Sequence, residues 1–121
     1  MNKAAFRSLE CDVMNPNCPA RAVLALLAEK WSLLIIHALS EGTMRTSAIR
    51  RRVGGISEKM LIQTLRRLEA AGLVDRLDHG EVPPRVDYSL SHLGHSLSPL
   101  ITALDDWIEQ HALEIDARSQ R

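Results

Sequence analysis

The order of predicted elements in the middle of the chain constrains the fold more than any other sequence feature. Helical patterns over 46–53 and 58–71 are separated by the tight turn Gly54-Gly55. Two segments with the pattern of short strands follow at 73–77 and 85–90, and turn-forming residues join them into a hairpin. Two helices joined by a glycine turn and followed by a two-stranded hairpin predict a winged helix-turn-helix.

Capping residues and an apolar stripe support both of these helices. Thr46 or Ser47 can cap the first helix, and Ser57 is a good N-cap for the second. Gly72 suits the position just beyond the end of the second helix. The inward stripe of that helix is Leu61, Leu65 and Leu68. Its opposite face is cationic and hydrogen-bonding without being apolar.

Three more helices are predicted on either side, over 20–28, 31–39 and 91–115. The first has Arg21 as its only polar residue up to position 28, so it must be covered by the core or by another subunit. The predicted fold class is mainly α (α+β), a winged helix-turn-helix with a two-stranded wing and further helices on its N- and C-terminal sides. The predicted organisation is an N-terminal arm over 1–17, a winged helix-turn-helix domain over 18–115, and a C-terminal tail over 116–121.

Length and composition fit one domain and exclude several classes of protein. The chain has 121 residues, of which 45% are hydrophobic and 25% charged, so disordered, collagen-like and disulfide-scaffold proteins are excluded. The longest apolar run, 22–28, is far shorter than the roughly 18 residues that span a bilayer. No basic-then-apolar leader opens the sequence. We therefore expect a cytoplasmic protein with no membrane partner.

The net charge of zero conceals an uneven distribution. Residues 45–76 carry eight Lys and Arg against three Asp and Glu, a net of +5, whereas residues 77–121 carry three against eight, a net of −5. A concentrated basic patch attracts phosphates even when a distant acidic segment cancels its charge. The middle of the chain is therefore a candidate nucleic-acid surface, although charge runs also form ordinary solvated helix faces.

Motifs spread over about residues 18–108 together match a known family. They are Cys18-Pro19, Glu29-Lys30-Trp31, Gly55-Ile56-Ser57, Leu61, Leu65-Arg66, Leu68-Glu69, Gly72-Leu73-Val74, the run from Pro83 to Leu90, Gly94, Leu97, Pro99 and Trp107. This combination resembles the HxlR family of bacterial winged helix-turn-helix transcriptional regulators. The resemblance implies a homodimer held by the first and last helices, a recognition helix at 57–71 and a wing at 77–86. The sequence departs from the family pattern at Ala28-Glu29, where two glycines are usual, at Thr46, where an aromatic is common, and at Thr64, where arginine is frequent.

Side chains at the start of the recognition helix are the candidates for reading double-stranded DNA, while neighbouring cations hold phosphates. Gln63 is the strongest candidate for a base contact, because a side-chain amide can pair bidentately with adenine. The base-edge candidates are Ser57, Lys59, Met60, Gln63 and Thr64. The phosphate candidates are Arg45, Arg50, Arg51, Arg52, Arg66 and Arg67, with His79 and Arg85 reaching the minor groove from the wing. Successive helix positions point about 100° apart, so one or two arginines of the run 50–52 should face away from DNA.

Cys18 and Cys11 are the candidate sensor residues. Cys18 immediately precedes a helix, whose free N–H groups stabilise a thiolate, and some HxlR-family members use a cysteine here to sense quinones, aldehydes or oxidants. Cys11 lies seven residues upstream, close enough to be a resolving thiol or an intersubunit partner, and since the chain has two cysteines, any disulfide must join these two sites. The alternative is that Cys18 is a small residue packed at the dimer interface.

Other chemistries have little support. His92 and His95 lie three residues apart on one helix, but no ligand-rich spacing of a zinc site is present, so no metal or cofactor is expected. The chain has no Gly-rich phosphate loop, nucleophile motif or recognisable acid–base pair, so no enzyme is expected. His37, on an apolar helix, is interpreted as a core or interface histidine.

These features predict a sequence-specific regulator of transcription that binds double-stranded DNA. It is expected to be a repressor, to act as a homodimer on an inverted repeat, and to be switched by thiol modification at Cys18. Two alternatives stay open. The regulator could instead respond to a small-molecule effector at the dimer interface, or the winged helix could bind an acidic protein partner and have no DNA target.

Overall fold

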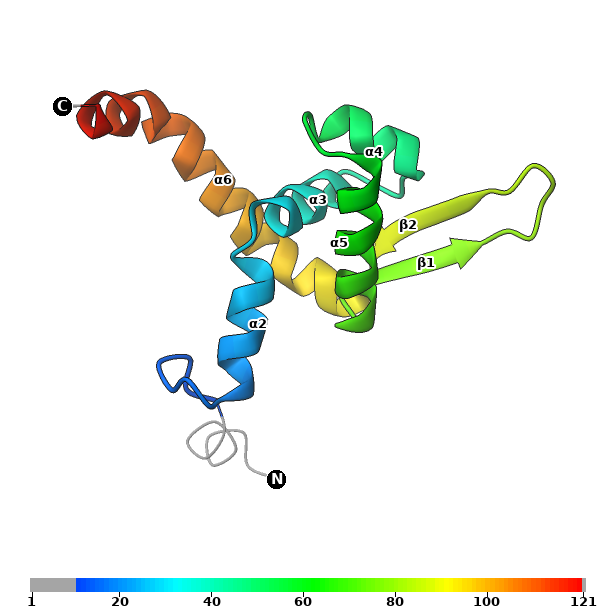
Figure 1. The fold of residues 1–121 in the computed structure, drawn as a ribbon, viewed down its shortest axis with the longest axis horizontal. Helices are drawn as coiled ribbons and strands as arrows, with labels where there is room; N and C mark the ends of the chain where they lie inside the picture. The colour runs from blue at the N-terminus through cyan, green and yellow to red at the C-terminus, as the bar shows by residue number, and fades with distance from the viewer. Residues whose placement is uncertain (1–10, 121) are drawn as a thin grey trace.

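The computed structural model describes residues 11–120 and has the predicted winged helix-turn-helix architecture (Figure 1). The elements follow in the order α2 (Pro19–Leu27), α3 (Lys30–Ser40), α4 (Thr46–Arg52), α5 (Glu58–Ala70), β1 (Val74–Asp78), β2 (Val86–Leu90) and α6 (His92–Ser119). Each predicted helix and strand is present. The last helix continues through Pro99 and ends at Ser119, four residues beyond the predicted end. Residues 1–10 of the predicted arm and Arg121 of the predicted tail lie outside the described residues.

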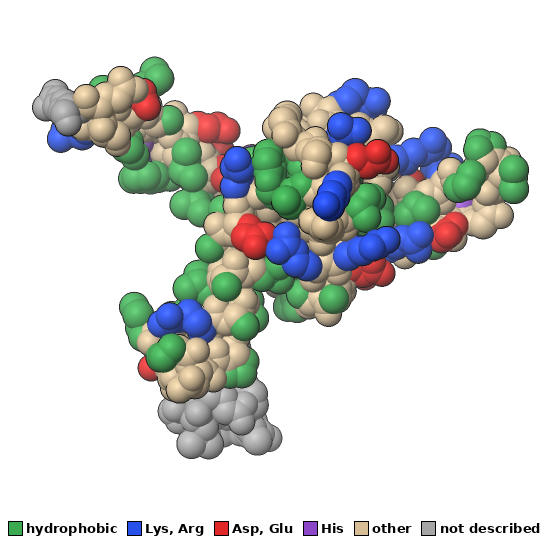
Figure 2. All heavy atoms as spheres, viewed as in Figure 1, with side chains coloured by type: hydrophobic (Ala, Val, Ile, Leu, Met, Phe, Trp, Pro, Cys, Tyr) green, Lys and Arg blue, Asp and Glu red, His purple; other side chains and the backbone are tan. Residues whose placement is uncertain are grey.

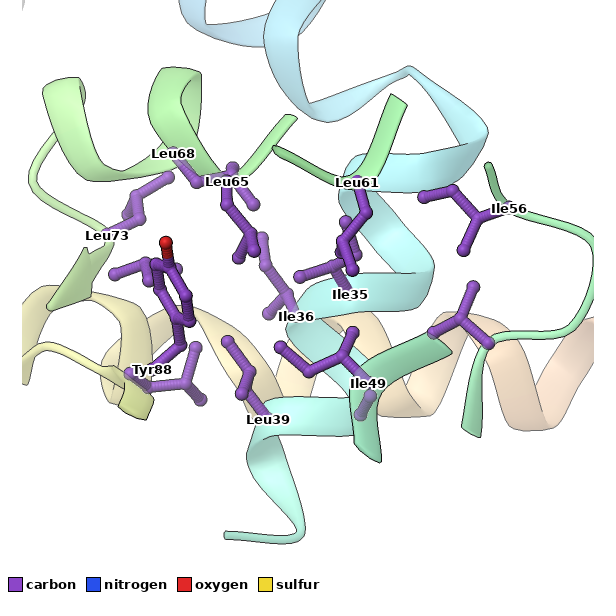
Figure 3. Close-up of a cluster of buried hydrophobic side chains, with 14 of the residues drawn as sticks. Ile35, Ile36, Leu39, Ile49, Ile56, Leu61, Leu65, Leu68, Leu73 and Tyr88 are labelled. Atoms are coloured by element: carbon purple, nitrogen blue, oxygen red, sulfur yellow. The ribbon is translucent and has the colours of Figure 1, made fainter. Parts of the chain in front are cut away.

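Helix α3 lies at the centre of the core. Its side chains Ile35, Ile36 and Leu39 are buried and meet the inward stripe of α5, which is the predicted one (Figure 3). Ile49 of α4 and Tyr88 of β2 close the cluster from the other side. Fully burying an aliphatic side chain contributes about 1.5–3 kcal/mol. The stripe therefore fixes which face of α5 points into the core and which points outward.

The hairpin pairs β1 with β2 in antiparallel register, from Val74 opposite Leu90 to Asp78 opposite Val86. Met44 adds a bridge to the far side of β2: its N–H donates to the Tyr88 carbonyl at 2.9 Å, and the Tyr88 N–H donates to the Met44 carbonyl at 2.8 Å. This bridge holds the chain extended up to the first turn of α4. The N-cap of α4 is consequently Arg45, which makes no side-chain cap hydrogen bond.

The prediction that Thr46 or Ser47 caps α4 is therefore wrong. Both residues lie inside the first turn of the helix. The bridge between residues 44 and 88 decides where the helix starts, and a pairing over that sequence distance is invisible to local capping rules.

Helix α6 begins where the two ends of the hairpin meet. Ser91 is its N-cap and accepts a hydrogen bond from the Gly94 N–H at 3.0 Å. The same Ser91 hydroxyl donates to the Gly72 carbonyl at 2.6 Å, just beyond α5. Gly94 is buried against the Leu73 backbone, where a larger residue has no room. Helix α5, the hairpin and α6 are thus joined at one point.

Helices α2 and α6 extend away from this core in different directions (Figure 1). No residue of α2 is buried in the single chain, so the core covers this apolar helix only in part, and coverage by another subunit stays a prediction. Helix α6 also has large hydrophobic side chains that are exposed, and these are Leu93, Leu100, Leu104, Trp107, Ile108, Leu113 and Ile115. Over residues 11–120, no individual helix is long and apolar enough to cross a membrane. Helices α2 and α3 together, with a bend of 74° between them, are long and apolar enough, but by length and composition only.

Candidate nucleic-acid interface

The outer face of α5 carries an amide between two cations. Ser57 begins the helix as predicted, because its side-chain oxygen accepts a hydrogen bond from the Met60 N–H at 3.1 Å. Lys59, Gln63 and Arg66 follow at spacing i, i+4 and i+7, and all three are exposed. Met60 is half-buried at the edge of this face. The face opposite the leucine stripe is therefore polar and open, as the sequence predicted.

The prediction that Thr64 contacts a base edge is wrong. Its side chain is 0% exposed, and its hydroxyl donates to the Met60 carbonyl oxygen at 2.8 Å. This hydrogen bond satisfies the hydroxyl within the helix, which allows threonine to lie among the leucines. The buried stripe of α5 therefore includes a polar residue that the apolar periodicity does not identify.

Arg67 is exposed but turns away from the outer face of α5. Its Nη1 donates to Glu29 Oε1 at 3.0 Å, and its Nη2 lies 2.9 Å from Glu29 Oε2. Glu29 is the N-cap residue of α3, at the join with α2. The ion pair therefore links α5 to the α2–α3 join, across 38 residues of sequence.

The three arginines at the end of α4 diverge as helical geometry predicts. Arg50 and Arg51 line a groove of about 590 Å³ together with Ser57, beside the start of α5. Arg52 turns toward the end of α3, where its Nε and Nη2 each donate to the Glu41 carboxylate at 2.7 Å. Hydrogen bonding to Arg52 holds the pKa of Glu41 below its ordinary value. Arg50 and Arg51 are thus the two arginines of this run that border the recognition helix.

A second groove of about 680 Å³ separates α5 from the hairpin. Its arginines are Arg45, Arg66, Arg76 and Arg85. Arg76 was not among the predicted site residues, and neither was Ser47, which lines both grooves. The predicted pairing of the two strands is the signal that could have found Arg76, since it places that side chain on the same small sheet as Arg85.

Asp87, near the loop end of the paired strands, contacts both predicted wing residues. His79 Nε2 lies 2.8 Å from Asp87 Oδ2, and Arg85 Nη2 donates to the same oxygen at 3.3 Å. Arg45 Nε lies 4.0 Å from the other carboxylate oxygen. The hydrogen bond with His79 is the main reason that the pKa of Asp87 lies below its ordinary value, and Arg85 lowers it further. The carboxylate therefore holds three candidate DNA-contacting side chains in one cluster.

The two cysteines flank a turn that leads into α2. Cys18 is the N-cap of this helix, and its sulfur accepts hydrogen bonds from the Ala20 N–H at 3.4 Å and the Asp12 N–H at 3.3 Å. Cys18 is 7% exposed, whereas Cys11 is exposed, and both are thiols. Because Asp12 follows Cys11 directly, the turn brings the two predicted sensor residues into the same local structure.

A cavity of about 520 Å³ lies between α3, the α4–α5 turn and α6. On its wall, His37 Nδ1 is 2.6 Å from Asp105 Oδ2, although the two residues are 68 positions apart. No sequence pattern indicated this His–Asp pair, but the interpretation of His37 as a satisfied histidine between packed helices is confirmed. The apolar lining residues are Leu33, Leu34, Ala38, Val53 and Ile108. Within residues 11–120, no cluster of three or more His, Cys, Asp or Glu side chains could hold a metal ion.

Cationic and apolar surfaces lie on different parts of the molecule. Figure 2 shows Lys and Arg side chains over α4, α5 and the hairpin, whereas hydrophobic side chains gather along α2 and α6. The first surface has the charge that a phosphate backbone requires. The second has the character of a surface that another protein covers.

Known proteins share both the sequence and this architecture. The sequence model of the HxlR-like helix-turn-helix family matches residues 26–116. The HTH-type transcriptional regulator YtfH of Escherichia coli K12 is 45% identical over 106 residues, which cover 88% of this chain and 84% of YtfH. The structure of the transcriptional regulator ytfH from Salmonella typhimurium is 43% identical with a TM-score of 0.84, and the match covers 91% of this chain and 98% of that one.

A redox regulator is also among the similar structures. HypR in its oxidized form is 34% identical with a TM-score of 0.70, and the match covers 77% of this chain and 96% of HypR. The family match, the two YtfH relatives and the winged architecture agree with the resemblance seen in the sequence. The chain belongs to the HxlR-like helix-turn-helix family of transcriptional regulators.

Proposed function

We propose that this chain is a sequence-specific repressor that binds an inverted repeat in double-stranded DNA as a homodimer, with α5 in the major groove. The observation that carries the proposal is the outer face of α5, where Lys59, Gln63 and Arg66 are exposed and two arginine-lined grooves border the same helix. A helix with this surface presents a base-reading amide and phosphate-binding cations together.

The roles of the side chains follow from their positions. Gln63 pairs with an adenine, and Ser57, Lys59 and Met60 lie along the base edges near it. Arg66 and Arg51 hold phosphates on the two sides of the helix. Arg85 and His79 act from the wing, and Arg45 acts from the start of α4 beside it; Asp87 contacts all three.

The exposed apolar faces of α2 and α6 support the homodimer. Val23 and Leu24 of α2, together with Leu100, Leu104 and Trp107 of α6, are large hydrophobic side chains exposed in the single chain. Exposed apolar surface of this kind marks a protein interface. A twofold dimer through these helices presents two copies of α5 to two half-sites about one turn of DNA apart.

Titration of a fluorescent duplex tests the DNA-binding surface. The promoter of the chain's own or a neighbouring operon and a random duplex of equal length are compared over a range of salt concentrations. The double variant Lys59→Ala with Arg66→Ala should weaken binding to both, and the slope of log affinity against log salt should become shallower by about 1.8, or about 0.9 for each phosphate that is no longer neutralised. Arg118→Ala, near the far end of α6, is the control. If the double variant keeps the wild-type slope, this face is not the DNA surface.

Gln63→Ala separates base reading from phosphate binding. The variant should lose about 1–3 kcal/mol on the specific promoter and little on the random duplex, because a bidentate amide–adenine pair discriminates by that amount. Equal losses on the two duplexes would count against a role for Gln63 in specificity.

We propose further that modification of the Cys18 thiol releases DNA. The Cys18 sulfur accepts two backbone hydrogen bonds at the start of α2, so a changed sulfur disturbs the end of a helix that we place in the dimer interface. The similarity to the redox regulator HypR supports this switch. With diamide, a disulfide between Cys11 and Cys18 forms as the two thiols lose two protons and two electrons, which diamide accepts. Diamide should release DNA from the wild type but not from Cys18→Ser, and an equal response of both proteins would end the proposal.

The cavity lined by α3 and α6 supports a second candidate signal, a small organic effector. Its volume of about 520 Å³ and its apolar lining with one His–Asp pair are typical of a small-molecule site. An effector bound there would contact α6 and the turn that precedes α5. Leu34→Trp should fill the cavity, so it should abolish a response to such an effector while leaving the diamide response of Cys18 intact.

A further inference from the structure

One cation of the recognition helix is neutralised within the chain itself. Arg67 follows Gln63 by one helical turn, yet both terminal nitrogens of its guanidinium contact the Glu29 carboxylate, at 3.0 and 2.9 Å. The other cations of the outer face, Lys59 and Arg66, project into solvent. The pair lies on the surface, since the side chains of Arg67 and Glu29 are 44% and 43% exposed.

Glu29 occupies a capping position, but its side chain binds Arg67 instead of its own helix. Glu29 is the N-cap residue of α3, where a polar side chain ordinarily accepts a hydrogen bond from its own helix. Its side chain makes no cap hydrogen bond, and both carboxylate oxygens are directed to Arg67 instead. The hydroxyl of Thr64, 3.4 Å from Arg67 Nη2, further orients the guanidinium toward the α2–α3 join.

The pair also borders the candidate base-reading side chains. Glu29 and Arg67 line a groove of about 650 Å³ whose other walls include Met60, Gln63 and Arg66. A DNA backbone that passes along this edge of α5 would reach Arg67 at the place where Glu29 now holds it. A phosphate that binds the same two nitrogens of the fork has to displace the carboxylate.

We propose that Glu29 is a specificity-determining residue that withholds Arg67 from DNA phosphates. The inference rests on the proposed DNA-binding function. Phosphate contacts add affinity for every sequence, whereas base contacts add affinity for the correct one. By occupying Arg67, Glu29 removes one sequence-independent interaction and raises the share of the affinity that depends on Gln63 and its neighbours.

Salt-dependent binding of the isosteric variant Glu29→Gln tests this role. On a random duplex, Glu29→Gln should bind more tightly than the wild type, and its slope of log affinity against log salt should be steeper by about 0.9, the value of one more neutralised phosphate. Arg67→Gln should keep the wild-type slope. The double variant Glu29→Gln with Arg67→Gln should behave like Arg67→Gln alone, because the effect passes through Arg67.

Glu41→Gln is the matched control. It removes the same charge from a bidentate pair of similar exposure, Glu41 with Arg52, which faces α3 instead of the outer face of α5. Its slope should equal that of the wild type. Circular dichroism confirms the fold of each variant. Glu29→Ala provides a second way to free Arg67, and its slope should match that of Glu29→Gln.

Three results would overturn the inference. They are an unchanged slope in both Glu29 variants, an equal change in Glu29→Gln and Glu41→Gln, and an effect of Glu29→Gln that persists without Arg67. Failure of the proposed function looks different, because the wild type would then bind neither the promoter nor the random duplex. In that case both proposals are wrong.

Discussion

At the scale of residues, one side chain of the hairpin, Asp87, has a pKa that makes the stability of the fold depend on pH. The hydrogen bond with His79 is the largest cause of the lowered pKa of Asp87, and Arg85 adds to it. The folded-state pKa is thus below the unfolded value of about 3.9. Ionised Asp87 therefore stabilises the fold above that pH, and the contribution is lost as the pH falls through the lower folded pKa.

Asp87→Asn should remove this pH-dependent contribution. The difference in the free energy of unfolding between wild type and variant should be fully developed at about pH 5 and should shrink below about pH 4, as the wild-type carboxylate becomes protonated. Urea unfolding followed by circular dichroism at several pH values measures it. Asp75→Asn, on the facing strand, is the control. A difference that stays the same at every pH would contradict the assignment.

The sequence does not reveal where the side chains of Thr64 and Arg67 lie. Both lie on a helix whose ends and leucine stripe were predicted, and both were assigned to the DNA-contacting set. Thr64 is buried because its hydroxyl bonds within the helix, and Arg67 is held by Glu29 from another part of the chain. Neither interaction has a periodic signature, so only the three-dimensional structure separates these side chains from Lys59 and Gln63.

At the scale of elements, the sequence predicts best where local chemistry decides. The second helix of the helix-turn-helix ends as expected, since Gly72 adopts a φ of +77° that favours glycine, and Ser57 begins it. The start of α4 was missed because the pairing of Met44 with Tyr88 controls it. The end of α6 was missed because its last turns extend beyond the core, where burial does not mark the boundary.

The packing of α6 onto the hairpin depends on a residue without a side chain. A Cβ atom at Gly94 would overlap the Leu73 carbonyl oxygen and crowd a methyl group of Leu90. Gly94→Ala should therefore destabilise the fold by about 1–3 kcal/mol, the cost of overpacking, even though alanine favours helices by about 1 kcal/mol. Thermal and urea unfolding measure the change in stability.

Gly54→Ala is the matched control for this prediction. A Cβ atom at Gly54 meets nothing within 4 Å, and its backbone needs no left-handed conformation. The change should leave stability unchanged or raise it by about 0.4–1 kcal/mol, because alanine restricts the unfolded chain. If Gly94→Ala were as harmless as Gly54→Ala, the close approach of α6 to Leu73 would not exist in solution.

At the scale of the whole molecule, the net charge is zero because cations and carboxylates that lie on different surfaces cancel each other. The cations concentrate over α4, α5 and the hairpin, and the carboxylates of the last 45 residues include those along α6 (Figure 2). An acidic α6 repels phosphates, so DNA approaches most favourably from the α5 side. The same helix carries exposed apolar side chains, which suit it to contact a second copy of the chain.

The last prediction tests the proposed dimer interface by a substitution at Leu100. This side chain is 70% exposed on the apolar face of α6, so Leu100→Glu should leave the fold of the single chain intact. In a twofold interface the change occurs twice. A loss of about 1.5 kcal/mol of association free energy at each copy raises the dimer dissociation constant about 100-fold. Sedimentation should show a shift from dimer to monomer, and affinity for an inverted repeat should fall toward that for a single half-site. Val82→Glu, at the 97% exposed tip of the hairpin, should remain dimeric. A dimer that survives Leu100→Glu at micromolar concentration would place the interface elsewhere.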